Sequence, residues 1–127
     1  KYWAPGVLAA DGKIYFAPGS ADRALVVDPE AGAASLLGPP IPGGLNLNKY
    51  WAPGVLAADG KIYFAPGSAD RALVVDPEAG AASLLGPPIP GGLNLNKYWA
   101  PGVLAADGKI YFAPGSADRA LVVDPEA

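Results

Sequence analysis

The sequence predicts an all-β protein made of repeated four-stranded antiparallel units, and three observations lead to this fold class. One segment recurs with a period of 48 residues, so that Lys1, Lys49 and Lys97 each open a copy. Within each copy, short runs rich in β-branched and aromatic residues alternate with turns that contain glycine and proline. No segment has the apolar periodicity of a long amphipathic helix.

The copies define the organisation of the chain. The first two occupy residues 1–48 and 49–96, and the third, residues 97–127, stops at the counterpart of Ala31. Every residue from Lys49 onward is identical to the residue 48 positions earlier. Three full copies would need 144 residues, 17 more than the 127 present. We expect the protein to contain these residues or an equivalent strand, because a blade without its fourth strand has an unpaired edge.

Each copy is expected to form four strands, which in the first copy lie near residues 7–10, 14–17, 24–27 and 33–37. Asp11-Gly12 predicts a tight hairpin turn, since glycine adopts positive φ without steric cost. Asp28-Pro29 opens a second turn, with proline at the position that favours it. Residues 38–44 are too rich in proline and glycine for a helix or an inner strand, so they are expected to link one copy to the next.

Four antiparallel strands in 48 residues are typical of one blade of a β-propeller. The third strand supports this interpretation, because Ala24 and Val26 fall on one face while Leu25 and Val27 fall on the other. A sheet that is apolar on both faces must be covered on both, as when blades stack face to face. A two-sheet sandwich or an open β-solenoid is the alternative, although a sandwich would alternate polar and apolar residues more cleanly. The side chains expected to be buried, with their copies 48 and 96 positions on, are Leu8, Ile14, Phe16, Leu25, Val26 and Val27.

Composition argues against several classes of function. A formal net charge of −3 does not favour a nucleic-acid partner. The apolar runs are too short to span a membrane, and Pro5, Gly6 and Asp11 interrupt any signal-peptide core. The absence of cysteine excludes a disulfide framework and a thiolate nucleophile.

We predict no catalytic, cofactor-binding or metal-binding site. Three of the four acids in a copy fall in hairpin turns, where carboxylates accept backbone hydrogen bonds. The four acids are Asp11, Asp22, Asp28 and Glu30. With neither histidine nor cysteine, the chain lacks the common zinc ligands, and Ser20 and Ser35 have no histidine base. The alternatives are a carboxylate pair for glycoside hydrolysis and a ring of identical acids that holds an ion weakly at the axis.

The aromatic residues Tyr2, Trp3, Tyr15 and Phe16 are expected to pack between blades, because aromatic side chains bring large buried area. A sugar-binding surface is the alternative for the same residues. Lys1 and Arg23 are expected to pair with acids at the rim, and each exposed pair would contribute about 0 to 1 kcal/mol.

Repetition without divergence points to a designed protein, since surface positions of natural repeats drift freely. Cys, His, Met, Gln and Thr are all absent. The unchanged segment KYWAPGVLAADGKIYF, followed in each copy by ALVVDPEA, resembles the designed symmetric β-propellers with identical blades. The resemblance covers the whole chain and implies a soluble synthetic protein, made in the bacterial cytoplasm, with no natural substrate or location. A recent natural duplication is the alternative.

We expect the protein to be a homo-oligomeric, self-assembling scaffold without enzymatic activity, cofactor or small-molecule ligand. A propeller needs about four blades to close, and this chain supplies fewer than three complete ones. Each repeat contacts only its neighbours, so a head-to-tail contact between chains could close a ring. Three chains of three copies would give nine blades, so a trimer is expected, with an eight-bladed ring as the alternative. A ligand- or sugar-binding propeller that uses its loop face or central pore is the second functional hypothesis, and an enzyme is the third.

Overall fold

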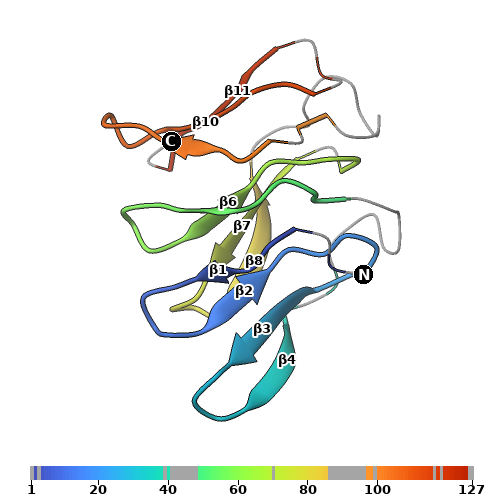
Figure 1. The fold of residues 1–127 in the computed structure, drawn as a ribbon, viewed down its shortest axis with the longest axis vertical. Helices are drawn as coiled ribbons and strands as arrows, with labels where there is room; N and C mark the ends of the chain where they lie inside the picture. The colour runs from blue at the N-terminus through green and yellow to red at the C-terminus, as the bar shows by residue number, and fades with distance from the viewer. Residues whose placement is uncertain are drawn as a thin grey trace.

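The computed structural model describes most of the chain, apart from the links between copies and a few single positions. The described residues are 2, 4–38, 40, 49–69, 71–85, 97–98, 100–115, 117 and 119–125. They form three antiparallel sheets, one in each copy, which stack one above another along the long axis of the molecule (Figure 1). No helix in this part of the chain is long and apolar enough to cross a membrane.

The first sheet is a meander in which each strand pairs with the next. Its strands are β1 (Val7–Leu8), β2 (Ile14–Phe16), β3 (Ala24–Asp28) and β4 (Ala33–Leu37), in the order β1-β2-β3-β4. These bounds confirm the four predicted strands, although β1 is only two residues long. The register places Tyr15 opposite Val26, so these two side chains share one face of the sheet.

The second and third sheets repeat this meander and its register 48 and 96 residues further on. The second sheet consists of β5 (Val55–Leu56), β6 (Ile62–Phe64), β7 (Ala72–Asp76) and β8 (Ala81–Leu85). The third consists of β9 (Val103–Leu104), β10 (Ile110–Phe112) and β11 (Leu121–Val123). The second sheet therefore has the four-stranded architecture that the sequence predicts for one blade, and the third sheet has the first three of these strands.

The two predicted hairpin turns are present in the first sheet. Gly12 has a φ of 82° and Gly32 a φ of 66°, a region that side-chain-bearing residues adopt at a cost. The first turn is closed by the N–H of Gly12, which donates to the carbonyl of Ala9 at 3.0 Å. Glycine at these positions thus ends one strand and starts the next without backbone strain.

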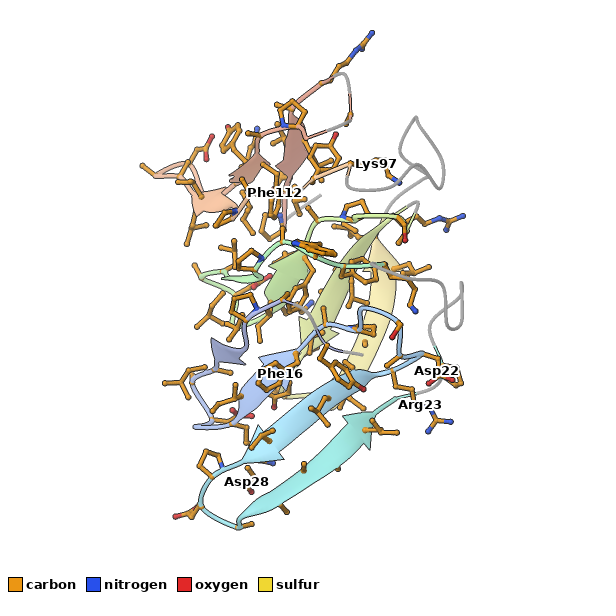
Figure 2. All side chains as sticks on the ribbon, turned by 45° about the vertical axis from the view of Figure 1, so that its right-hand side comes forward. Phe16, Asp22, Arg23, Asp28, Lys97 and Phe112 are labelled. Carbon is orange, nitrogen blue, oxygen red and sulfur yellow. The ribbon has the colours of Figure 1, made fainter. Side chains whose placement is uncertain are left out.

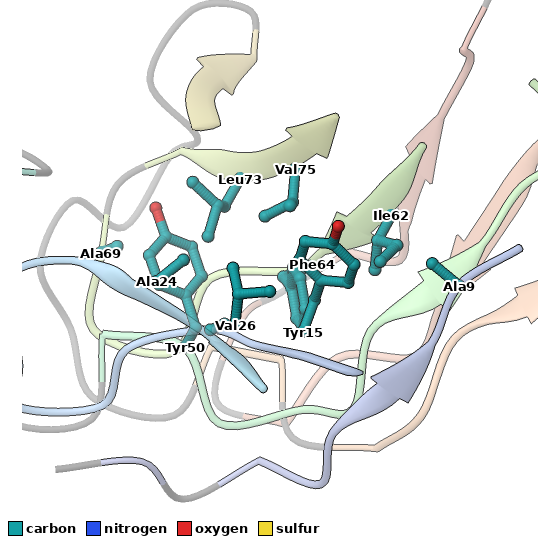
Figure 3. Close-up of a cluster of buried hydrophobic side chains, with 11 residues drawn as sticks. Ala9, Tyr15, Ala24, Val26, Tyr50, Ile62, Phe64, Ala69, Leu73 and Val75 are labelled. Atoms are coloured by element: carbon teal, nitrogen blue, oxygen red, sulfur yellow. The ribbon is translucent and has the colours of Figure 1, made fainter. Parts of the chain in front are cut away.

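Each sheet presents two different apolar faces, which we name by their aromatic residue. In the first sheet the tyrosine face carries Ala9, Tyr15, Ala17, Ala24 and Val26. In the second sheet the phenylalanine face carries Tyr50, Ile62, Phe64, Leu73 and Val75. These two sets of side chains interdigitate between the sheets and form one buried cluster (Figure 3).

A second cluster has the same composition and lies between the second and third sheets. The tyrosine face of the second sheet supplies Tyr63 and Val74, and the phenylalanine face of the third supplies Tyr98, Ile110 and Phe112. The core therefore lies between sheets, as the two-faced third strand predicts. Aromatic packing between blades is confirmed for Tyr15 and, through their copies Tyr50 and Phe64, for the residue types of Tyr2 and Phe16, whereas Tyr2 and Phe16 themselves lie outside these clusters.

The short first strand is crowded because an aromatic ring lies against its glycine. A Cβ atom placed on Gly54 would come within 2.4 Å of Cε2 of Phe64, and one on Gly6 within 2.6 Å of Cζ of Phe16. Only glycine lets the ring approach the backbone this closely. The packing of the phenylalanine therefore depends on the small residue in the neighbouring strand.

The predicted core is wrong at Leu8, which is 63% exposed, and at its third copy, Leu104, which is 40% exposed. Val122, the third copy of the buried Val26, is also exposed, at 49%. Position in the stack explains Leu8 and Val122, because Leu8 belongs to the first sheet and Val122 to the last, and each faces a side that no neighbouring sheet covers. It does not explain Leu104, which pairs with the buried Ile110 on a covered face. Ile14, Phe16, Leu25 and Val27 are half-buried because of their position in the stack, whereas their copies in the second sheet are fully buried.

Candidate functional site

The interface between the first two sheets is anchored by a tyrosine from the start of the second copy. Tyr50 is fully buried, and its hydroxyl donates a hydrogen bond to the carbonyl of Arg71 at 3.0 Å. The third copy repeats the arrangement, with the Tyr98 hydroxyl donating to Arg119 at 2.9 Å. This bond holds the ring in place on its own sheet while the ring packs against the preceding sheet.

The third sheet presents a tyrosine face that no other sheet covers. Tyr111 is 39% exposed, whereas its copy Tyr63 in the second sheet is 2% exposed. Val122 is 49% exposed, against 8% for Val74. The residue types are identical, so the difference comes from what is missing around them, a following sheet and the fourth strand of the third sheet itself.

The loop that follows β10 is also uncovered. Ala113, Pro114 and Gly115 are exposed, although the equivalent residues of the first two sheets are buried. In those sheets the loop lies under the first residues of the next copy, since the Tyr98 N–H donates to the carbonyl of Pro66 at 3.2 Å. The loop therefore belongs to the same open surface as Tyr111 and Val122.

At the other end of the stack, the first sheet presents an open phenylalanine face. Leu8 and Leu36 are 63% and 55% exposed, and Phe16 is half-buried. In the second sheet the equivalent Phe64 is fully buried against the tyrosine face of the first. The two ends of the molecule thus expose the two opposite halves of one repeated interface.

Backbone hydrogen bonds cross each interface at one end of the sheets. The N–H of Lys49 donates to the carbonyl of Gly19 in the first sheet at 3.1 Å. The carbonyl of Lys49 accepts from the N–H of Gly67 at 2.8 Å, within its own copy. The opening lysine therefore lies between the loops of two successive sheets.

The side chain of this lysine is buried, which the sequence did not indicate. Lys49 and Lys97 are each 1% exposed. Desolvation lowers the pKa of Lys49, while the negative charge of Asp22 in the preceding sheet acts in the opposite direction. Asp22 and Arg23 lie at the same end of the sheets as Lys97, and Asp28 lies at the other end (Figure 2). The rim ion pairs expected for Lys1 and Arg23 stay a prediction, and Lys1 and Trp3 lie outside the described residues.

The acids of the hairpins serve the turns, as predicted. An Oδ1 atom of Asp11 accepts the N–H of Lys13 at 2.9 Å, and Oδ1 of Asp28 accepts the N–H of Glu30 at 3.1 Å. Asp11 has a second partner that sequence reasoning missed, because the Tyr15 hydroxyl donates to its Oδ2 at 2.6 Å. Tyr15 follows Asp11 by four residues across the hairpin turn, and this spacing would have indicated the pair if the register of the hairpin had been known.

The pKa of Asp11 lies below its ordinary value. Desolvation acts to raise the pKa, but the hydrogen bonds from Tyr15 and from the N–H of Lys13 outweigh it. The pKa of Tyr15 is raised, first by desolvation and then by its bond to Asp11. These shifts reflect a structural hydrogen bond on a turn.

The remaining candidate residues are spread over the sheets. Ser35 and Glu30 are exposed on the outer strand and its turn, while Ser20 is half-buried in the loop before Asp22. Within the described residues, no three acids come together as a group that would hold a metal ion. The most extensive candidate binding surfaces are therefore the two open apolar faces at the ends of the stack.

Comparison with known proteins identifies the fold. No protein family and no curated protein matches the sequence. A catalytically inactive histidine-to-alanine variant of virginiamycin B lyase from Staphylococcus aureus, with quinupristin, superimposes with a TM-score of 0.70 at 15% identity, over 97% of this chain and 38% of that chain. A streptogramin B lyase gives 0.68 at 14% identity over 96% and 37%, and selenomethionine-substituted virginiamycin B lyase gives 0.70 at 14% over 99% and 38%.

The chain thus spans less than two fifths of the proteins that it resembles in structure. At these identities the likeness shows the fold alone. It confirms the predicted all-β architecture of propeller-like, four-stranded antiparallel sheets.

Proposed function

We propose that this protein is a self-assembling structural scaffold whose copies associate head to tail into a closed β-propeller ring. One observation carries the proposal: the open tyrosine face of the third sheet and the open phenylalanine face of the first match the two sides of an interface that occurs twice within the chain, apart from the fourth strand, which supplies Leu37 and Leu85 to those interfaces and has no counterpart in the third sheet. A second copy of this chain would therefore offer a surface of the kind that the chain already buries between its own sheets.

The driving force is the burial of apolar side chains that the single chain leaves in water. Leu8, Leu36, Val103 and Val122 are each at least 49% exposed. Covering apolar surface stabilises a complex by roughly 25 cal/mol per Å², before the entropy lost on association is subtracted. The contact is heterologous, and such contacts form rings when the rotation between units closes the circle.

Identical interfaces favour closure, because each new contact repeats the rotation already present between the sheets of one chain. Nine blades from three chains is the assembly that the repeat count supports, and eight blades is the alternative. Design as a symmetric propeller belongs to this proposal, since exact repetition makes every interface equivalent.

The alternative of an enzyme is favoured only by the likeness to lyases. One of those proteins is described as catalytically inactive after a histidine is replaced by alanine, and this chain contains no histidine. We therefore propose a function without catalysis. Incubation with quinupristin is the direct test, and cleavage that rises with protein concentration would favour the enzyme instead.

Light scattering coupled to size exclusion, with native mass spectrometry, tests the assembly. We expect the 127-residue chain to form a discrete particle of several chains, and three chains would support nine blades. Val122→Glu places a charge on the open tyrosine face and should reduce the particle to single chains. Ala31→Glu, in an exposed turn, is the matched control and should assemble as the parent does. A parent that remains a single chain at high concentration would overturn the proposal.

A further inference from the structure

The lysine that opens each copy makes contacts on both sides of an interface between sheets. The N–H of Lys49 donates to Gly19 of the preceding sheet at 3.1 Å. Its carbonyl accepts from Gly67 at 2.8 Å and from Ala69 at 3.3 Å, both in its own copy. One residue thus joins two successive loops.

The next copy extends these bonds into a continuous series. The carbonyl of Gly67 accepts from the N–H of Lys97 at 3.2 Å, and the carbonyl of Lys97 accepts from Gly115 at 2.8 Å. The series runs across all three sheets and both interfaces.

The lysine side chains are enclosed by the same interfaces. Lysine is almost never fully buried unless its charge is compensated, yet Lys49 and Lys97 are each 1% exposed. The charge of Asp22, from the preceding sheet, acts on Lys49 across the interface. The opening lysine therefore contributes both backbone hydrogen bonds and a buried side chain to the contact between sheets.

The series is incomplete at the third sheet. Gly115 is exposed, whereas Gly19 and Gly67 are buried beneath the following lysine. No backbone donor among the described residues reaches the Gly115 carbonyl. At the two internal interfaces, the equivalent carbonyl accepts the backbone N–H of the lysine that opens the next copy.

We propose that the opening lysine anchors one sheet to the next, and that Lys1 takes this role between chains by docking against the exposed loop 113–115 of a second copy. This inference rests on the proposed head-to-tail assembly. Apolar burial is non-directional, but hydrogen bonds fix distance and angle. The anchor would therefore set the direction and register in which the two apolar faces meet.

The test compares Lys1→Ala, and a chain that begins at Tyr2, with the parent by sedimentation velocity over a range of concentrations. Lys1→Ala should weaken association at least tenfold, about 1.4 kcal/mol. The shortened chain should weaken association further, because it also loses the backbone groups of residue 1. Lys13→Ala is the matched control: it removes the same side chain from the first sheet, but in the hairpin turn after β1. Equal dissociation constants for the parent and both Lys1 variants would overturn the anchor while leaving the assembly itself intact.

A second measurement separates this inference from the proposed function. Lys49→Ala removes the same side chain from an interface within the chain, where no association is needed. We expect Lys49→Ala to lower the urea midpoint of unfolding clearly more than Lys61→Ala, its control in the hairpin turn after β5. If the parent does not associate but Lys49→Ala has this effect, the scaffold proposal fails and the anchoring role of the lysine is retained. Equal midpoints for the two variants would contradict the anchor directly.

Discussion

The three sheets repeat the same residues in their first three strands, and the third sheet has no fourth strand, but equivalent residues differ in what surrounds them. Phe64 and Tyr63, on opposite faces of the second sheet, are both almost completely buried. Phe16 of the first sheet is only half-buried, and Tyr111 of the third is 39% exposed. Identical sequence thus produces a core residue in one copy and a surface residue in another, so a residue's contribution to stability depends on whether its neighbouring sheet is present.

The largest expected effect comes from removing a phenylalanine. Phe64→Ala should lower the free energy of unfolding by about 3–5 kcal/mol, because the ring is fully buried between two sheets. Phe16→Ala should cost clearly less in the single chain, since its face is open. Urea unfolding at low protein concentration measures both. Equal losses there would contradict the dependence on a neighbour, while a Phe16→Ala cost that rises with protein concentration would support association through this face.

An intermediate effect is expected at the glycine beneath the ring. Gly54→Ala places a methyl group within 2.4 Å of Cε2 of Phe64, so the ring must shift, at a cost of about 1–3 kcal/mol. Thermal or urea unfolding checks this loss. The double variant Gly54→Ala with Phe64→Leu should lose less than the sum of the two single variants, because the smaller side chain makes room for the methyl group. Strict additivity would show that the glycine acts through its backbone conformation instead.

The smallest expected effect is a dependence of stability on pH through the turn acids. Hydrogen bonds hold the folded pKa of Asp11 and Asp107 below the ordinary value of 3.8. A lowered folded pKa means that the stabilisation is present above the unfolded pKa and is lost as pH falls through the folded pKa. The free energy of unfolding should therefore decline below about pH 4. In Asp11→Asn, the free energy of unfolding should fall less steeply below this pH than in the parent. The same pH dependence in the variant and the parent would contradict the stabilising role given to the hydrogen bonds of Asp11.

Much of the local structure follows from the sequence. Turn residues such as Gly12 and Gly32 mark where strands end, and the alternation in β3 assigns side chains to two apolar faces. The acids in the turns could be assigned to backbone hydrogen bonds for the same local reason. These features depend on neighbours in the chain, so pattern and propensity are enough to predict them.

The contacts of the candidate interface could not be predicted from local sequence patterns. The burial of Lys49 contradicts the usual behaviour of lysine, and it arises from loops that are 18 or more residues away in the chain. The bond between Tyr15 and Asp11 required the register of the hairpin, not only its existence. Leu8 has the residue type of a core position, yet no covering sheet lies on its side.

By itself, the sequence determined the repeat, the four strands of each unit, their turns and the presence of two apolar faces. Only the tertiary structure decided which face meets which, that the opening lysine lies between two loops, and which copies remain open at the ends. The physical reason is that strand and turn formation depend on local backbone preferences, whereas burial depends on the position of the neighbouring sheet. The copies have the same local preferences over the residues that they share, so the differences among equivalent residues come from the neighbouring sheets and, in the third sheet, from the absence of a fourth strand.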